Sequence, residues 1–523
     1  MSAAPRARRT ALSRSTVSPV PLVTAFRPAD EVAAHPPRLS FRTTPLPEGA
    51  LALPQRGEDG ELHGTPIPED PATPLTLIDL LESHGDVASW VREGRGVVAL
   101  GRTLEISARG EERIEELRAA WRATVYASWW EDPLVRPGTG PVALGTIAFS
   151  PASAERSALL VPRMLVGLDD EGGWITTAVA EGEEHPDPEA LLPALVSTAR
   201  LHRAAAERQE TAEVSPGALS EEAWCEAVVE TQRRMAEGEA RKVVLARDVL
   251  VRPSRGLATG TVLGHLARHY PSCWTFAVDG MIGATPELLV RLEGRRLFSR
   301  VLAGTARRSG AADAVPASPS ASPAGPDGTA SPAPGASPTG EEAAPTTDVL
   351  EDLAAWLTGS EKNREEHELA RASAVRALDP LCSVVEAPEP FVLTLPNVLH
   401  LATDVTGVVA GDTGALSLVR ALHPTAAVCG APTPSAARII EEVEGMDRGR
   451  YAGPVGWVDW HGEGEWGIAL RSARLSATEI GPSSPARVFG GGGIMPGSDP
   501  RDELAETRAK MRPVLEALGA AEG

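Results

Sequence analysis

The chain has 523 residues and a formal net charge of −21 at pH 7. This length allows two or three average domains, or one large one, with a substantial buried core. The acidic balance argues against a nucleic-acid groove or an anionic membrane surface as a partner, and no apolar run approaches the roughly 20 residues that span a bilayer. The four cysteines form no C-x-x-C pair, which favours reduced thiols and a cytoplasmic protein.

Residues 1–73 begin with a basic, serine-rich stretch without an apolar segment behind it, so we expect a mostly disordered tail and no secretory signal. Ordered patterning starts near residue 74. The spacing of apolar residues predicts a helix over 78–90, a buried strand over 96–101 and a helix over 111–130. The runs SALLVPRMLVGL and WITTAVA flank the turn DDEGG, which predicts an antiparallel hairpin.

A helix predicted over 188–210 closes this amino-terminal part, which we place at residues 74–215. The following region, 216–518, starts with Ser220 as a plausible N-cap for a helix. It continues through the strand KVVLARDVLV and a short helix over 260–269.

Residues 309–347 are almost entirely Ala, Pro, Ser, Gly and acid, and we expect a disordered insertion there. Helices are predicted from about residue 347 and again over 500–518, with strands between them. Strand-rich stretches with hairpin-length turns and interspersed helices favour an α+β fold with antiparallel sheets. A parallel α/β sheet is the alternative, which the hairpin spacing disfavours.

Lysine is rare in this chain: only Lys242, Lys362 and Lys510 occur, against 47 arginines. Arginine neither loses its proton near neutral pH nor presents a compact ammonium, so each lysine is a candidate functional group. Lys242 opens the apolar run VVLA, where loss of water would favour the neutral amine that a general base needs. The alternative is a strand-end lysine whose ammonium reaches solvent.

The final predicted helix carries Glu503, Glu506 and Lys510 on one face. Four glycines lie directly upstream, Gly490 to Gly493, and their backbone N–H groups could approach an anion closely. A solvated, charged helix face is the alternative interpretation.

The acidic helix near residue 363 repeats this arrangement, since Asn363 and Glu366 are three residues apart and Lys362 and His367 flank them. Oxygen ligands from two helices could hold Mg²⁺, although either helix alone would equally suit solvent. Glu287, in the sequence GATPE, precedes the apolar run LLVRL. In an apolar pocket its carboxyl could stay protonated and serve as a general acid, and a simple turn is the alternative.

Ten motifs occur in a fixed order over residues 220–515: RKVVLAR, GATPELL, LAGTARR, EKNREEHE, HLATDVTG, LHPTAAVCGAP, YAGPVGW, GEWGIALR, FGGGGI and ELAETRAK. In this order they resemble the chorismate-utilising enzymes, and among them the isochorismate synthases. The resemblance implies one fold, a two-layer α/β sandwich with antiparallel sheets like that of the anthranilate and aminodeoxychorismate synthases. It also implies an isomerase that converts chorismate reversibly to isochorismate with Mg²⁺.

The resemblance implies that Lys242 is the base that activates water for attack at C2, and that Glu287 is the acid that protonates the departing C4 hydroxyl. It implies that Glu366 and Glu506 ligate Mg²⁺, with Glu503 in or near the same shell. The substrate-binding residues that it implies are Gly304, His400, Ala427, Arg471, Gly491 and Lys510. Asn363 stands where the family usually has an acid, which removes one charge near the metal.

Single residues distinguish this chain from related enzymes with other activities. Lys242 argues against anthranilate synthases, which lack this lysine, and Ala303 argues against aminodeoxychorismate synthases, which carry a nucleophilic lysine there. Salicylate synthase is the alternative enzyme, although Ala427, where lyase-type members tend to have threonine, favours stopping at isochorismate. A chorismate-binding protein without turnover is the alternative outside enzymes.

The long amino-terminal half resembles that of menaquinone-type enzymes of high-GC actinobacteria, so we expect a role in menaquinone synthesis. A catechol siderophore pathway is the alternative. We expect a monomer that binds chorismate and isochorismate, and neither nucleic acid nor membranes.

Overall fold

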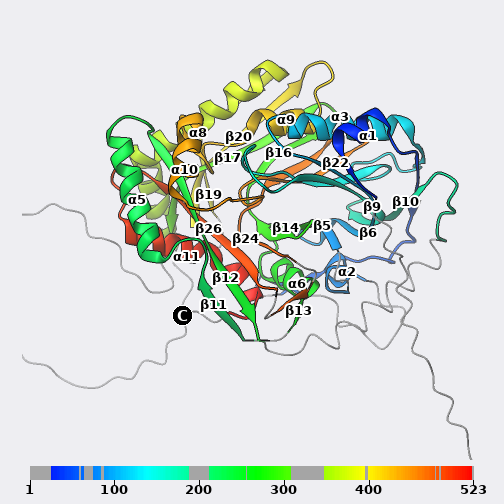
Figure 1. Ribbon diagram of the computed structural model, residues 1–523, viewed down its shortest axis with the longest axis horizontal. Helices are drawn as coiled ribbons and strands as arrows, with labels where there is room; N and C mark the ends of the chain where they lie inside the picture. Colours follow the sequence, from blue (N-terminus) through cyan, green and yellow to red (C-terminus); the bar gives the residue numbers. More distant parts are fainter. Residues whose placement is uncertain are drawn as a thin grey trace, which may run out of the picture.

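The structure, a computed structural model, describes residues 25–57, 60–63, 75–83, 87–187, 211–254, 256–307, 347–394, 398–476, 479–481 and 484–520. Helices and mostly antiparallel strands give the α+β fold that the sequence predicts (Figure 1). The helices are α1 (Ala29–Ala34), α2 (Leu77–Ser83), α3 (Arg113–Ala127), α5 (Glu221–Ala236), α6 (Thr259–His269), α7 (Thr347–Gly359), α8 (Glu361–Leu378), the 3-10 helix η1 (Asp379–Leu381), α9 (Ala415–Leu422), α10 (Thr433–Val443) and α11 (Pro500–Ala517).

The strands alternate with these helices along the chain. They are β1 (Ala25–Pro28), β2 (Leu39–Pro45), β3 (Gln55–Arg56), β4 (Leu62–His63), β5 (Val87–Arg92), β6 (Arg95–Ala108), β7 (Trp129–Glu131), β8 (Val142–Thr146), β9 (Ser157–Asp169), β10 (Gly172–Ala180), β11 (Ala212–Pro216), β12 (Lys242–Pro253), β13 (Leu257–Ala258), β14 (Trp274–Val278), β15 (Met281–Thr285), β16 (Leu288–Glu293), β17 (Arg296–Arg307), β18 (Cys382–Glu386), β19 (Phe391–Thr394), β20 (Val398–Val409), β21 (Gly430–Ala431), β22 (Pro454–Asp459), β23 (Gly464–Ile468), β24 (Ser472–Arg474), β25 (Glu479–Ile480) and β26 (Ala486–Ile494).

Within the described residues, 22 of these strands form one hydrogen-bonded network. It branches at the paired long strands β6 and β9 into two arms. The first arm runs β9–β8–β22–β23–β16–β17–β20, and the second runs β6–β5–β14–β15–β24–β26–β12. Every pairing along both arms is antiparallel, whereas the amino-terminal strands β1 and β2 pair in parallel with β6 and β7.

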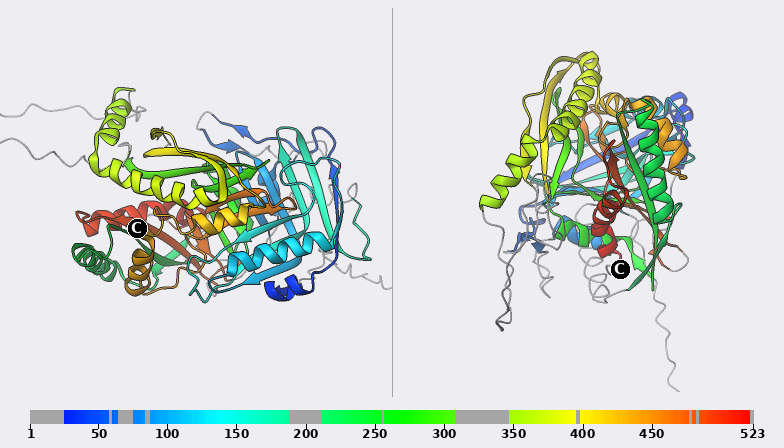
Figure 2. Two further views of the ribbon diagram at one scale, coloured as in Figure 1. Left: turned by 90° about the horizontal axis from the view of Figure 1, so that it is seen from above. Right: turned by 90° about the vertical axis from the view of Figure 1, so that its left-hand side faces the viewer.

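Helices cover each arm on one side. Helices α3, α8 and α9 contact strands of the first arm or its root, and α6 and α11 contact strands of the second. Figure 1 shows α3, α8 and α9 along the upper side of the molecule and α2, α6 and α11 along the lower side. In Figure 2, as in Figure 1, the yellow-green helix α8 and the red helix α11 share one end of the molecule. The two helices that the sequence predicts to carry acidic ligands therefore belong to different layers at the same end.

Local signals account for several of these elements. The Ser220 hydroxyl accepts the N–H of Ala223 at 3.2 Å and starts α5 as predicted. Asp499 caps α11, whose first residue is Pro500, the position at which proline costs no hydrogen bond. The predicted hairpin is confirmed, because β9 and β10 pair across the turn formed by Asp170 and Glu171. None of the helices in the described ranges is long and apolar enough to cross a membrane.

Two sequence-based expectations are wrong. The helix predicted over 78–90 ends at Ser83, and Val87–Arg92 is strand β5, because the apolar run there fits a buried strand as well as a helix. The predicted tail contains ordered structure before residue 74, since β1, α1 and β2 lie within it and the two strands join the sheet network.

The side chains of β2 alternate between buried and more exposed positions, a pattern typical of a strand. The composition of the region concealed this pattern in the sequence. The predicted helix over 188–210 and the insertion up to residue 346 lie outside the described residues, and the boundary at 215/216 stays a prediction.

A buried ion cluster joins the two arms. Asp279, in the β14–β15 turn, accepts from Arg450 Nη2 at 2.7 Å, and the Asp279 carbonyl accepts from Arg450 Nη1 at 2.8 Å. Arg450 lies just before β22 of the first arm, and Arg156 and Arg102 also pair with Asp279. Burial opposes ionisation of Asp279, but the three guanidinium groups outweigh it and hold its pKa well below the usual range.

We expect Asp279→Asn to lower the free energy of unfolding by about 3–5 kcal/mol, because it leaves the buried Arg450 guanidinium without its carboxylate. Urea unfolding followed by fluorescence measures the loss. In the parent protein the stabilisation should fade as the pH drops below about 4, since a carboxyl with a depressed pKa loses its advantage as it is protonated. The control is Glu112→Gln at the exposed pair with Arg420, which should leave stability nearly unchanged. Equal effects of the two substitutions would contradict this account.

Candidate active site

Lys242 is the first residue of β12 and is only 4% exposed. It pairs with Ala431 of β21 on one edge of the strand. The next residue, Val243, pairs with Ile494 of β26 on the other edge. The apolar run that follows is buried on both faces, so the lysine is held at the end of a rigid, enclosed strand.

Glu287 lies in the short connection between β15 and β16. Its N–H donates to Thr285 Oγ1 at 3.2 Å, and its carbonyl accepts the N–H of Ile468 at 3.1 Å. Burial raises the pKa of Glu287 to about 7, even though the ammonium groups of Lys242 and Lys510 act to lower it. The carboxyl is therefore near half protonation at neutral pH, as a general acid requires.

Helix α11 and the glycine run meet as the sequence predicts. Lys510 Nζ donates to Glu506 Oε1 at 2.7 Å and to the Gly491 carbonyl at 2.9 Å. A Cβ atom at Gly491 would lie 2.9 Å from the carbonyl of Leu245 and 3.2 Å from Tyr451 Oη. Glycine is thus required here for close packing of β26 between β12 and the tyrosine.

Glu503 lies over the same glycines. Its Oε1 accepts from Ser498 Oγ at 2.6 Å, and a Cβ atom at Gly492 would lie 2.7 Å from its Oε2. Glu503 and Glu506, three residues apart on α11, carry carboxylate oxygens, the hard donors that suit Mg²⁺. Among the described side chains no group of three or more His, Cys, Asp or Glu is arranged to hold a metal, and the side chain of Glu366, on α8, lies outside them.

Arg471 follows β23 in the left-handed region, with φ of 48°, and its carbonyl accepts the N–H of Ala284 at 3.1 Å. Burial lowers its pKa, while Tyr451 and Glu506 are among the neighbours that act in the opposite direction. In the described part of the chain its guanidinium makes no hydrogen bond or ion pair. A partly buried guanidinium without a carboxylate is a natural binding group for an anion.

Gly304 and His400 come together in the backbone of the first arm. In the β17–β20 ladder, Ala303 pairs with Leu401 and Thr305 pairs with His400, so Gly304 is the extra residue of a β-bulge. The side chain of His400 lies outside the described residues. The two predicted substrate-binding positions are therefore neighbours across one irregularity of the sheet.

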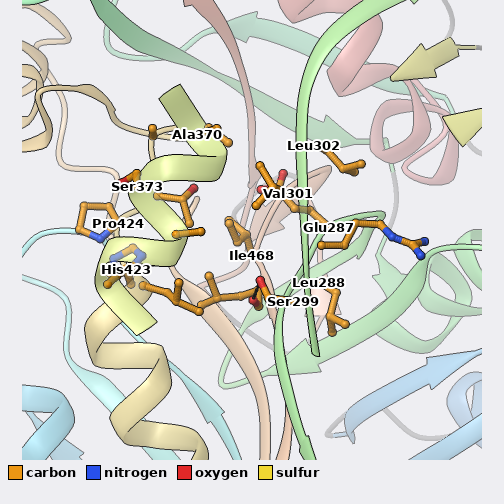
Figure 3. A pocket seen from close by; sticks show the side chains of 18 of the residues that line it. Glu287, Leu288, Ser299, Val301, Leu302, Ala370, Ser373, His423, Pro424 and Ile468 are labelled. Atoms are coloured by element: carbon orange, nitrogen blue, oxygen red, sulfur yellow. Dashed lines mark hydrogen bonds between the residues drawn. The ribbon is translucent and has the colours of Figure 1, made fainter. Parts of the chain in front are cut away.

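A cavity of about 220 Å³ lies between α8, the β16–β17 hairpin and the loop that follows α9. Glu287 and Ala427 both line it, which places two predicted site residues at one space. Figure 3 shows Ala370 and Ser373 of α8 on one side and Val301 of β17 on the other. Glu366 lies one helical turn before Ala370 on the same helix.

Two residues of the acidic motif have structural partners. His367 is buried and its Nε2 lies 2.7 Å from Thr403 Oγ1, so it is a core histidine. Asn363 is buried, and its N–H donates to Ser360 Oγ at 3.3 Å at the start of α8.

The sequence analysis missed Tyr451, whose ring stacks on Phe489 with centroids 4.8 Å apart and whose hydroxyl lies beside Gly491. Its signal was available, since the chain has only three tyrosines and this one lies in the motif YAGPVGW.

We expect a carboxyl titration of Glu287, followed by ¹³C NMR and assigned with Glu287→Gln, to have a midpoint of about 7. Lys510→Met should move the midpoint upward, because it removes a positive charge that favours the carboxylate. Lys510→Arg keeps that charge and should leave the midpoint near 7. A downward shift in the methionine variant would contradict the electrostatic account.

Comparisons with known proteins point to one family. The profile of the chorismate binding enzyme family matches residues 85–516. An isochorismate synthase named MenF from Bacillus subtilis is 28% identical over 81% of this chain and 85% of its own length. A salicylate biosynthesis isochorismate synthase from Pseudomonas aeruginosa is 30% identical over 87% of this chain and 89% of its own.

The crystal structure of a putative 2,3-dihydroxybenzoate-specific isochorismate synthase, DhbC, from Bacillus anthracis superposes with a TM-score of 0.61. It shares 26% sequence identity over 84% of this chain and 99% of that one. The family match and the shared fold extend across both arms of the sheet, and the chain belongs to the chorismate binding enzyme family.

Proposed function

We propose that this protein is an isochorismate synthase, which moves the hydroxyl of chorismate from C4 to C2. The observation that carries the proposal is the proximity of two groups at one site: Lys242, which is buried, and Glu287, whose pKa burial raises to about 7 while Lys242 acts to lower it. Close by, Arg471 and Lys510 offer positive charge to a substrate with two carboxylates. The names of the two full-length relatives support the same reaction.

In this mechanism neutral Lys242 accepts a proton from water as the water oxygen bonds to C2. The ring double bonds shift, and the C4–O bond breaks as Glu287 donates its proton to the departing hydroxyl. One water enters and one leaves, so the reaction is an isomerisation. Afterwards the proton on Lys242 has to return to Glu287 through solvent before the next turnover.

Anion recognition falls to the groups around the glycine run. Arg471 offers a fork that can bind a carboxylate with two hydrogen bonds, and Lys510 is already held beside Gly491. Tyr451 adds a hydroxyl next to the same backbone. Gly304, His400 and Ala427 are proposed to contact the remainder of the substrate from the bulge and the cavity.

Glu506 and Glu366, with Glu503 beside them, are proposed to hold Mg²⁺. When bound, the ion would neutralise the ring carboxylate of the substrate. The carboxylates of α11 suit such a hard cation, and the shared location of α8 and α11 at one end of the molecule supports the pairing of Glu366 with them.

We further propose a cytoplasmic role in menaquinone synthesis, supported by the extent of the match to the MenF protein through the amino-terminal half. The Pseudomonas relative, named for salicylate biosynthesis, matches the same half, so a siderophore pathway remains the second candidate. The four cysteines are unpaired, in keeping with a reducing compartment.

Incubation of the purified protein with chorismate and Mg²⁺ should yield isochorismate without pyruvate, as measured by chromatography with mass detection. EDTA should abolish the conversion and added Mg²⁺ should restore it, because the ion would be needed against the substrate carboxylate. Salicylate and pyruvate as the main products would instead identify a salicylate synthase. Binding of chorismate without any product would identify a non-catalytic binding protein.

Lys242→Arg should lower kcat by about 10²–10⁴-fold, the usual contribution of a positioned general base, because a guanidinium cannot accept the proton from water. Initial rates and circular dichroism measured side by side separate this loss from unfolding. The matched control is Arg241→Lys, which exchanges the same two residue types at the exposed neighbouring position and should retain full activity. Full activity in Lys242→Arg would rule out the proposed base.

A further inference from the structure

One edge of strand β12 is only partly covered by other strands. On the edge opposite β26, β21 pairs with Lys242 and Val243, and the Val244 N–H donates to the Cys429 carbonyl at 2.9 Å. Strand β11 takes up the same edge from Val249 onward. Between them, residues 245–248 have no strand partner on this edge within the described chain, and we call this stretch the edge gap.

A buried ion pair, Glu444 with Arg448, occupies the edge gap. Glu444 Oε1 accepts the N–H of Ala246 at 2.7 Å, and Arg448 Nη2 donates to the Val244 carbonyl at 2.6 Å. The two side chains bind each other through Arg448 Nε and Glu444 Oε2 at 2.9 Å and are 3% and 1% exposed. Together they supply to β12 the donor and the acceptor that a neighbouring strand would have supplied.

Arg448 also reaches a second segment. Its Nη1 donates to the Val428 carbonyl at 2.9 Å, in the loop whose preceding residue, Ala427, lines the cavity beside Glu287. The face of the guanidinium lies 4.4 Å from the centroid of the Phe149 ring, which limits its movement. One planar group therefore adds a side-chain bridge between the strand of Lys242 and the loop of Ala427 to the backbone hydrogen bonds that join them.

A contribution to the stability of the fold is by itself a weak explanation for the buried Glu444–Arg448 ion pair. Buried ion pairs are often replaceable by apolar residues of similar volume without loss of stability. Here such a replacement would leave the carbonyls of Val244 and Val428 and the N–H of Ala246 without these partners, and the two segments would be held by the backbone hydrogen bonds of β21 and of Val244 with Cys429 without the side-chain bridge. Lysine could not replace the arginine, because one ammonium lacks the planar fork that spans both carbonyls.

We propose that Arg448, oriented by Glu444, is a positioning residue that sets the separation between Lys242 and the cavity wall at Ala427. This inference rests on the proposed function, in which the water that attacks the substrate ring lies against Lys242. Among the described residues, the hydrogen-bond partners of the Arg448 side chain are Glu444, Val244 and Val428, and none of them belongs to α11.

The kinetic test is Arg448→Lys in the full-length protein. We expect kcat to fall by at least about tenfold, since displacement of a catalytic group by an ångström is enough for such losses. The KM for chorismate and the half-saturating Mg²⁺ concentration should each change by less than about threefold, because the charged groups proposed to bind them, Arg471, Lys510 and Glu506, lie on other elements. Glu444→Gln keeps an acceptor for Ala246 and should lose less kcat than Arg448→Lys.

The matched control is Asp279→Asn, which disrupts the other buried arginine–carboxylate pair described above. It should lower the urea midpoint at least as much as Arg448→Lys while its kcat stays within about twofold of the parent, since unrelated core damage does not move catalytic groups. Unchanged kcat in Arg448→Lys, or equal kcat losses in the two variants, would overturn the proposal.

A readout without turnover separates this inference from the proposed function. With only three lysines in the chain, protein labelled with [¹³Cε]lysine gives three ε resonances, which Lys→Arg variants assign. Arg448→Met should shift the Lys242 resonance and leave those of Lys362 and Lys510 in place. A shifted Lys242 signal in a protein that does not convert chorismate would sink the proposed function alone, and an unshifted signal in an active protein would sink the positioning role alone.

Discussion

Charge held away from water is the constraint on which the rest of this site depends. Lys242, Lys510 and Arg471 bring basic groups to this region, and Glu506 already pairs with Lys510. Burial lowers the pKa of Arg471 and raises that of Glu287, whereas neighbouring groups of opposite charge act in the other direction. Glu287 expresses this balance, because burial outweighs two ammonium groups and holds its pKa near neutrality. A substrate with negative charge would compensate the positive charge of these basic groups.

The sheet network supplies the rigidity that such a balance needs. The groups of the site come from β12, β26, α11, the β15–β16 connection and Arg471, which lies between β23 and β24. These segments are far apart in the sequence. Antiparallel pairing along each arm fixes their registers. Where β12 lacks a neighbouring strand, side chains of Glu444 and Arg448 take over. The hydrogen bonds made by the backbone therefore determine the geometry of the site in this protein.

The sequence predicted the fold class and the elements with strong local signals, such as the capped helices α5 and α11 and the β9–β10 hairpin. It failed where the local signal was ambiguous or weak. The apolar stretch around Trp90 suits a helix or a strand until its partner β14 is known. Strand β2 pairs with β10, which lies more than a hundred residues further along the chain. Both β1 and β2 also form parallel pairs, with β6 and β7 respectively.

For the site, residue type and motif order were enough to nominate Lys242, Glu287, Glu506 and Lys510, because their chemistry is specific. Tyr451 and Arg448 escaped notice, since a tyrosine or arginine gains its role here only from what it faces in the folded chain. The metal-binding role of Glu366 and the contacts of His400 stay predictions. Their backbone positions agree with the roles, whereas their side chains lie outside the described residues.

The pairing of β12 with β26 joins Val243 to Ile494, and α11, which completes the site, follows directly. Few of the ordering contacts around Lys242 can therefore form while the chain is still being synthesised. High contact order of this kind slows folding, because distant segments must meet before their contacts stabilise anything. During translation β12 would expose both its edges, and strands in that state are prone to pair with other chains. The yield of correctly folded protein should therefore depend on the time between synthesis of β12 and release of the carboxyl terminus.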